Sequence, residues 1–489
     1  MKRLALLVVG AATLASFNAT AQSSLTGPSS LTVPQGRSAT EQSAPTFAKD
    51  VAPIMYGKCA NCHRPGEVAP MSLLSYEDAR PWAKAIKAKV VAREMPPWGA
   101  DMTQTLPMRN DISLSQKEID TIAAWVDAGA ARGNAADMPP SPKFATGWTN
   151  GTEPDVVLEM PVEFDIPAEG ELGVQMFYSK VPWDEDRFAE IVELKPSNRA
   201  VLHHAGIFFV DIPEGATLVN GRIVDKDGKI IGDRGSRGLP STDSGLPGSS
   251  KLLSWVPGRG LDHHRANIGK RIPAGKYINW QLHYNPIGTP QKDRTKLGIW
   301  FNKVPVTHEV LIRQAGDPLA TMKGALSIYR AEGREVEYKA DPGSTRRSRN
   351  TPNIPPYAEN WRLTGITPVT EDITLYAMSP HMHLRGKSLK WVIVYPDGRE
   401  QTILNVPKFD FNWQFNYELK EPLKIPAGSK ILGLGVYDNS VRNKWNPGPH
   451  LEVYWSEQSW DEMYQPFTEY SVDSQDLTVL KPISSQQQK

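Results

Sequence analysis

The sequence predicts a multidomain protein in which an all-α domain is followed by two all-β, jelly-roll-like sandwich domains. The chain has 489 residues, which is more than one hydrophobic core usually serves. Apolar residues recur at helical spacing only between residues 44 and 134. Beyond about residue 150 the pattern changes to short β-branched and aromatic runs, which Gly, Pro and Asp interrupt.

The helical part, residues 44–134, carries two signals for the start of a helix. Ser75 is followed three residues later by Asp78, and Ser115 by Glu118. A serine side chain can accept a hydrogen bond from the backbone three residues on, while the acidic residue reaches back. The apolar residues that follow Ser115 recur at helical spacing, so we expect a helix there.

The β part divides into two expected sandwich domains, residues 150–305 and 306–480. Tyr277–Tyr284 and Leu389–Tyr395 are examples of its apolar runs. A proline-rich segment, Met138–Pro142, separates this part from the helical part and should be stiffer than a Gly/Ser tether.

The N-terminus resembles an export signal followed by a linker. Residues 1–21 contain two basic residues, an apolar run that is short for a membrane span, and a small-x-small cleavage sequence. Residues 22–43 are rich in Ser, Thr, Gln and Pro. We expect a periplasmic or secreted protein of a Gram-negative bacterium with no membrane span. The near balance of 55 basic and 54 acidic residues gives no reason to expect a nucleic-acid partner.

Both cysteines of the chain lie in one motif, Cys59-Ala60-Asn61-Cys62-His63. Cys-x-x-Cys-His is the attachment sequence of a c-type haem, in which two thiols bond the porphyrin and the adjacent imidazole ligates the iron. We therefore expect one covalent haem c, held by Cys59, Cys62 and His63.

Met95 is the expected sixth ligand of the iron, because it lies in a proline-rich loop between two expected helices. Met71, Met102 and Met108 remain alternatives. The run from Met95 through Trp125–Ala130 resembles a small class I cytochrome c. Iron with Met and His ligands has both axial positions filled, which suits electron transfer better than peroxide chemistry.

Histidines of the β part form three groups that could hold metal. His203 and His204 open one strand-like run, His283 ends another, and His381 and His383 follow Ser379-Pro380. Residues i and i+2 of a strand share a face, so His381 and His383 can bind one ion. His203 and His204 would point to opposite faces unless the strand bends or bulges. Imidazole ligands suit zinc, copper, iron or nickel.

Four elements in order make the β part similar to the type II copper, ascorbate-dependent monooxygenases, the family of peptidylglycine α-hydroxylating and dopamine β-monooxygenases. These elements are the His-His pair, a Gln-x-His-Tyr element, a His-x-His-x-x-Gly element, and an acidic pair before a methionine. The chain supplies them as His203-His204, Gln281–Tyr284, His381–Gly386 and Asp461–Tyr464.

The resemblance implies two copper sites and assigns their ligands. His203, His204 and His283 would hold one copper. His381, His383 and Met463 would hold the catalytic copper, where a thioether favours Cu(I) over zinc. The family's disulfides have no counterpart in this chain, whose two cysteines lie in the haem motif. The residues that bind substrate in the animal enzymes also have no clear counterpart here, so the resemblance does not imply a peptide or catecholamine substrate.

Together these features predict a copper monooxygenase that hydroxylates a C–H bond of an unknown small organic substrate with O₂. Its electrons would come through the fused haem, from a periplasmic donor or from ascorbate. The alternative is a haem protein that binds copper and transfers electrons without catalysis. A haem peroxidase fits less well, because Met95 would close the iron.

Overall fold

The computed structural model describes residues 44–478, except 68, 146, 171, 232–250, 258, 317–327, 337, 341–346, 350 and 456–458. The expected signal (1–21) and linker (22–43) lie outside the described residues. So does the C-terminal segment 479–489.

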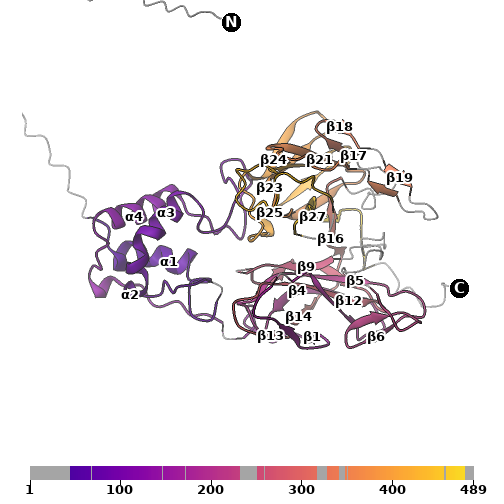
Figure 1. Ribbon diagram of the computed structural model, residues 1–489, viewed down its shortest axis with the longest axis horizontal. Helices are drawn as coiled ribbons and strands as arrows, with labels where there is room; N and C mark the ends of the chain where they lie inside the picture. Colours follow the sequence, from indigo (N-terminus) through magenta and orange to yellow (C-terminus); the bar gives the residue numbers. More distant parts are fainter. Residues whose placement is uncertain are drawn as a thin grey trace, which may run out of the picture. The chain divides into compact units, whose positions relative to one another are not determined.

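Short helices occupy the part that follows residue 44 (Figure 1). They are η1 (Phe47–Val51), α1 (Ala52–Lys58), α2 (Tyr76–Ala79), η2 (Arg80–Trp82), α3 (Ala83–Val91), α4 (Gln116–Asp127) and η3 (Ala135–Asp137). Their apolar faces share one core, in which Trp125 and Phe47 are fully buried.

Both predicted helix starts are confirmed. The Ser75 side chain accepts from the backbone N–H of Asp78 at the start of α2. Ser115 and Glu118 form a complete capping box at the start of α4. The box satisfies backbone donors that the first turn of a helix leaves unpaired.

The first pair of sheets covers much of the region 156–309. One sheet has the order β1-β14-β4-β11-β15, with β10 also paired to β4, and the other has the order β3-β12-β5-β9. The strands are β1 (Val156–Glu159), β3 (Gln175–Lys180), β4 (Arg187–Lys195), β5 (Leu202–Val210), β9 (Lys251–Trp255), β10 (Asp262–His263), β11 (Ile268–Ile272), β12 (Tyr277–Tyr284), β14 (Lys296–Phe301) and β15 (His308–Glu309). Buried residues of both sheets, among them Leu194 and Trp280, form one core.

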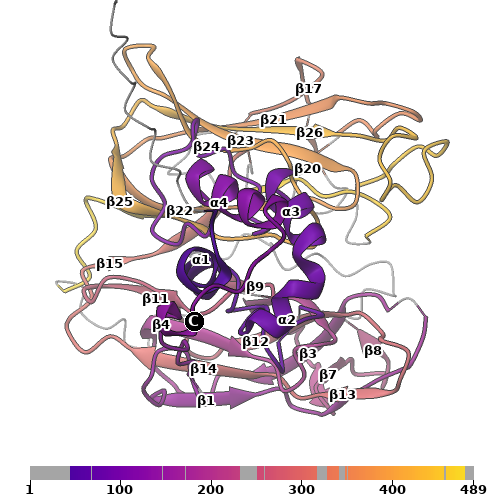
Figure 2. The same ribbon diagram turned by 90° about the vertical axis from the view of Figure 1, so that its left-hand side faces the viewer.

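The second pair of sheets follows from residue 311. Its sheets have the orders β16-β27-β22-β25 and β18-β17-β21-β26-β23-β24. The strands are β16 (Leu311–Gln314), β17 (Ile328–Ala331), β18 (Arg334–Glu335), β21 (Trp361–Pro368), β22 (Ile373–His381), β23 (Gly386–Val394), β24 (Glu400–Val406), β25 (Tyr417–Ile425), β26 (Lys430–Tyr437) and β27 (Gln465–Val472). Figure 2 shows β21, β23, β24 and β26 as one layer and β22 and β25 beneath it.

Three small sheets complete the described strands. They pair β2 (Phe164–Ile166) with β13 (Gln291–Asp293), β19 (Tyr338–Ala340) with β20 (Arg347–Arg349), and β6 (Thr217–Val219) with β7 (Arg222–Val224) and β8 (Ile230–Ile231). Sandwich-like sheets thus make up most of the described chain, which confirms the β part of the predicted fold class. Among the described helices, none has the length and apolar character needed to cross a membrane.

A segment between α3 and α4 packs on the second sandwich. Trp98 is buried in the core of that sandwich, where its ring lies 4.7 Å from the ring of Tyr417. Backbone bonds from Asp101 to Asn405 and from Leu106 to Ile403 continue the contact. The expected 44–134 unit therefore shares part of its core with the second sandwich.

Candidate metal centres

His203, His204 and His283 converge, although two of them are neighbours in sequence. His203 and His204 lie on β5, and His283 lies opposite His204 on the adjacent strand β12. The register then jumps, because Tyr284 pairs with Leu202 and His203 is left as the extra residue of a bulge. The bulge that these neighbours need to face one ion is therefore present, and one ring nitrogen of each histidine lies within 4.8 Å of the others.

The ring nitrogens of this triad lie close enough together to bind one ion. The Nδ1 atoms of His203 and His204 lie 3.1 Å apart. The Nδ1 atom of His283 is buried without a hydrogen-bond partner, while the ring also hydrogen-bonds the backbone of Leu172. A buried polar atom without a partner is costly in a folded protein, and a metal ion here would remove that cost.

Burial keeps the triad neutral. It lowers the pKa of His283 to about 4, with smaller contributions from His203 and His383. Burial also lowers the pKa of His203 and, more strongly, that of His204. Because only a neutral imidazole has a lone pair to give a metal, all three rings are in the ligating form at neutral pH.

His381, His383 and Met463 form the second cluster. His381 is the last residue of β22, His383 follows it in the turn, and Met463 precedes β27, which pairs with β22. The Nε2 atom of His381 lies 3.2 Å from the sulfur of Met463. The Nδ1 atom of His383 lies 3.2 Å from the carbonyl oxygen of Asp461. Since a carbonyl only accepts, Nδ1 of His383 carries the proton and Nε2 keeps its lone pair.

Glu462, which is fully buried, holds this cluster together. Its carboxyl oxygens accept from the backbone N–H of His383 at 2.9 Å and from that of Arg385 at 2.6 Å. Burial raises the pKa of Glu462 to about 8, while these backbone bonds and the Arg385 charge favour the carboxylate. Glu462, the second residue of the acidic pair seen in the sequence, thus fixes the turn that carries His383.

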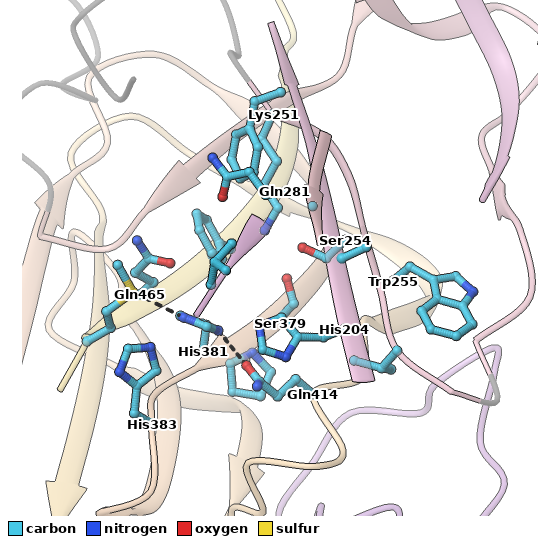
Figure 3. A pocket seen from close by; sticks show the side chains of 18 residues that line it. His204, Lys251, Ser254, Trp255, Gln281, Ser379, His381, His383, Gln414 and Gln465 are labelled. Atoms are coloured by element: carbon cyan, nitrogen blue, oxygen red, sulfur yellow. Dashed lines mark hydrogen bonds between the residues drawn. The ribbon is translucent and has the colours of Figure 1, made fainter. Parts of the chain in front are cut away.

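A cavity of about 110 Å³ lies next to both clusters (Figure 3). His204 lines it from one sandwich, and His381, His383 and Met463 line it from the other. The ring of Phe411 lies between the clusters, with centroids 5.7 Å from those of His204 and His383. The structure therefore brings the six predicted copper ligands into two neighbouring sets.

The donor sets fit copper. Three imidazoles in one set suit several metals, but two imidazoles with a thioether favour Cu(I), because sulfur is a soft ligand. The residues present could thus hold the two coppers that the sequence predicts.

The haem motif ends α1, where Cys59 caps the helix and both cysteines are free thiols. The Nδ1 atom of His63 lies 3.1 Å from the carbonyl oxygen of Met71. A carbonyl here requires an N–H at Nδ1, which leaves the Nε2 lone pair of His63 for an iron. The residues present therefore fit covalent haem.

The four candidate methionines have different surroundings. Met95 lines a cavity of about 770 Å³ together with Val90, Leu114 and Ile119 of the helical core. Met71 packs against that same core. Met102 accepts a hydrogen bond from the Trp98 indole at 3.1 Å, and Met108 is buried in the core of the second sandwich. Met102 lines the same cavity as Met95, so the assignment of Met95 as the sixth ligand stays a prediction.

No protein-family model and no curated protein matches the chain. A solved allantoicase is 8% identical and covers 56% of this chain and 81% of its own, with a TM-score of 0.15. A tandem CBM22 domain of Xyn10C from Paenibacillus barcinonensis is 8% identical, with coverages of 66% and 81% and a TM-score of 0.15. The allantoicase of Saccharomyces cerevisiae is 9% identical, with coverages of 56% and 80% and a TM-score of 0.13. Similarities this low carry no conclusion about function.

Sequence reasoning missed the loop of residues 407–416. Asn412 lies 2.9 Å from His203, and Gln414 lies 2.5 Å from His381. The only signal in the sequence is the strict alternation of aromatic and polar residues from Phe409 to Tyr417. That alternation is typical of a strand, but the structure forms turns and loop before β25 begins at Tyr417.

Proposed function

We propose that the protein is an exported copper-dependent monooxygenase that hydroxylates a C–H bond of a small organic substrate, with electrons supplied through its own c-type haem. The arrangement of the imidazole nitrogens is the observation that carries this proposal. Ring nitrogens of three partly buried histidines lie within 4.8 Å of one another. In the other cluster His381 faces the sulfur of Met463 at 3.2 Å, and the His383 ring lies 5.3 Å from that of His381. This donor pattern matches the resemblance to the type II copper monooxygenases.

The overall reaction balances with two electrons. One oxygen atom of O₂ enters the C–H bond as a hydroxyl group, and the other leaves as water with two protons. Copper, when bound, would supply the two electrons, one from each site. The protein must then hold a substrate beside His381, His383 and Met463, and limit the access of water.

The cavity has the side chains for both tasks. Val174, Trp255, Val256 and Phe467 give it apolar walls that exclude water. Polar side chains that could orient a substrate are Ser254, Gln281, Ser379 and Gln465 (Figure 3).

Contacts between the helical part and the β part support the electron supply. Glu67, four residues beyond His63, pairs with Arg199 at 2.9 Å, and Arg199 lies four residues before His203. The Lys408 ammonium donates to the carbonyl of Ala92 at 3.2 Å. Such contacts would hold a haem near the two sites within one molecule.

A screen under ¹⁸O₂ tests the proposal. Reduced, copper-loaded protein is incubated with pooled small metabolites, and O₂ uptake and labelled products are measured. One ¹⁸O atom should enter a product for every two electrons consumed. O₂ uptake that yields peroxide or water alone, with no labelled product, would favour the non-catalytic electron-transfer protein.

A further inference from the structure

One loop touches both histidine clusters. Residues 407–416 connect β24 to β25, and they contact four of the five predicted copper-binding histidines. Asn412 reaches His203, Gln414 reaches His381, and the Phe411 ring packs against His203, His204 and His383. These two amides and the phenyl ring come from one short stretch of chain, although the clusters belong to different sandwiches.

The orientation of the Asn412 amide follows from its neighbour. Its Nδ2 group lies 2.9 Å from the carboxylate Oδ1 of Asp410, which also accepts the backbone N–H of Asn412. A carboxylate only accepts, so the NH₂ group of Asn412 must face Asp410. The Asn412 oxygen then faces Nε2 of His203 at 2.9 Å, which must carry the proton. Consequently Nδ1 of His203 keeps its lone pair, and that atom faces His204.

Gln414 acts in the same way on the other cluster. Its Nε2 group donates to the carbonyl oxygen of Phe411 at 2.8 Å, so its oxygen faces Nδ1 of His381 at 2.5 Å. Nδ1 of His381 must therefore carry the proton, and Nε2 keeps the lone pair beside Met463 (Figure 3). The two histidines are thus held in opposite tautomers by two amides of one loop.

We propose that Asn412 and Gln414 are positioning residues that fix the tautomers and ring orientations of His203 and His381, so that the loop 407–416 prepares both metal sites at once. The proposal rests on the proposed function for the identity of the metal. Without these amides each imidazole could rotate or change tautomer, and a ligand atom would be lost from part of the population. Outer partners of metal-binding histidines typically contribute 10- to 100-fold to metal affinity.

The test uses full-length, haem-containing protein in two single-site backgrounds. His283→Ala leaves the His381 site, and His381→Ala leaves the triad. Into each background we place Asn412→Leu, Gln414→Leu or the control Asn416→Leu. Asn416 is a buried amide at the end of the same loop, but it bonds Glu469 at 3.3 Å instead of a histidine. Cu(I) affinity is measured by competition with a chromophoric chelator, and Cu(II) geometry by electron paramagnetic resonance.

The expected result is a crossed pattern. Asn412→Leu should weaken copper binding at the triad by about 10- to 100-fold and leave the His381 site unchanged, and Gln414→Leu should do the reverse. Gln414→Glu keeps an acceptor for His381 and should restore most of the affinity. Asn416→Leu should change neither site. If both sites bind copper and neither leucine variant alters its site by more than about twofold, the proposal is wrong.

Nitrogen-15 NMR of the histidines tests the loop without metal or substitution. His203 should carry its proton on Nε2 and His381 on Nδ1. Mixed tautomers in the native protein would overturn the proposal even if copper binds. If native protein binds no copper at all, the proposed function fails, while this spectrum still decides the role of the loop.

Discussion

Replacing Asp262 by Asn tests the contribution of a buried ion cluster that joins the two sandwiches. Asp262 is 4% exposed on β10, and its carboxylate contacts Arg259 Nε at 3.1 Å and Lys270 Nζ at 3.3 Å. Lys270 also lies 3.5 Å from Glu469 on β27 of the second sandwich. The cluster thus spans the boundary across which the two histidine sites face each other.

The expected loss of stability follows from the burial of all the partners. The side chains of Arg259 and Lys270 are 9% and 3% exposed. Asp262→Asn therefore removes the negative charge that pairs with these two buried cations. Breaking a buried ion pair by removing one partner typically costs about 3–5 kcal/mol of the free energy of unfolding. We expect Asp262→Asn to fall in this range at pH 7.

The same change should depend on pH with a defined sign. Burial alone would raise the pKa of Asp262, but the Arg259 and Lys270 charges hold it below its ordinary value. A carboxylate with a depressed pKa in the folded state stabilises the protein above the unfolded pKa of about 3.9, and loses this effect as pH falls below it. Asparagine does not titrate, so the difference between the two proteins should shrink below about pH 4.

Urea unfolding of both proteins between pH 3 and pH 7 measures this difference, from the shift in midpoint and the slope. Glu163→Gln is the control, because Glu163 pairs with Lys292 where both side chains are more than half exposed. The control should cost less than about 1 kcal/mol. A difference below about 1 kcal/mol for Asp262→Asn at pH 7, or one that stays constant down to pH 3, would refute the reasoning.

Three further predictions concern the cofactors. Haem staining should survive denaturation and should disappear when Cys59 and Cys62 are both replaced by Ala. Met95→Ala should shift the absorption spectrum of the oxidised haem towards high spin and lower its reduction potential. An unchanged spectrum would assign the sixth ligand to another methionine. Met463→Ile should retain Cu(II) but weaken Cu(I), as measured by chelator competition, and equal loss of both states would contradict the thioether assignment. In protein that contains reduced haem and Cu(II), the rate of haem oxidation measured by stopped flow should be independent of protein concentration. His283→Ala should slow this step, and Met463→Ile should leave its rate nearly unchanged. A rate proportional to protein concentration would show that electrons pass between molecules.

The sequence predicted the local features of both clusters well. Neighbouring residues of a strand face opposite ways, so His203 and His204 were expected to need a bend or bulge to share an ion, and His203 is the bulged residue. The pairing of His381 and His383 was expected from a shared strand face, but only His381 lies on β22, and His383 reaches the site through the turn that Glu462 holds. The family resemblance gave the six candidate ligands, which the structure brings together, and the buried carboxyl of Glu462 holds the turn that carries His383.

Contacts between distant parts of the chain could not be predicted in the same way. Asn412 and His203 are 209 residues apart, and neither the period nor the composition of the loop indicates which histidine it meets. Trp98 lies within the expected helical unit in the sequence, yet its carbonyl accepts a hydrogen bond from Tyr417 in the second sandwich. Such pairings depend on how the sheets pack, and a single sequence carries little information about that. The assignment of the helical part to a cytochrome c domain stays a prediction.

Copper content combined with X-ray absorption of the reduced protein tests the central claim most directly. The native, haem-containing protein should bind two coppers per haem, and its reduced form should show copper–sulfur scattering from Met463. His381→Ala should remove one copper together with the sulfur signal, whereas His283→Ala should remove one copper and keep the signal. Zinc in place of copper, or reduced copper surrounded by nitrogen and oxygen alone, would contradict the account.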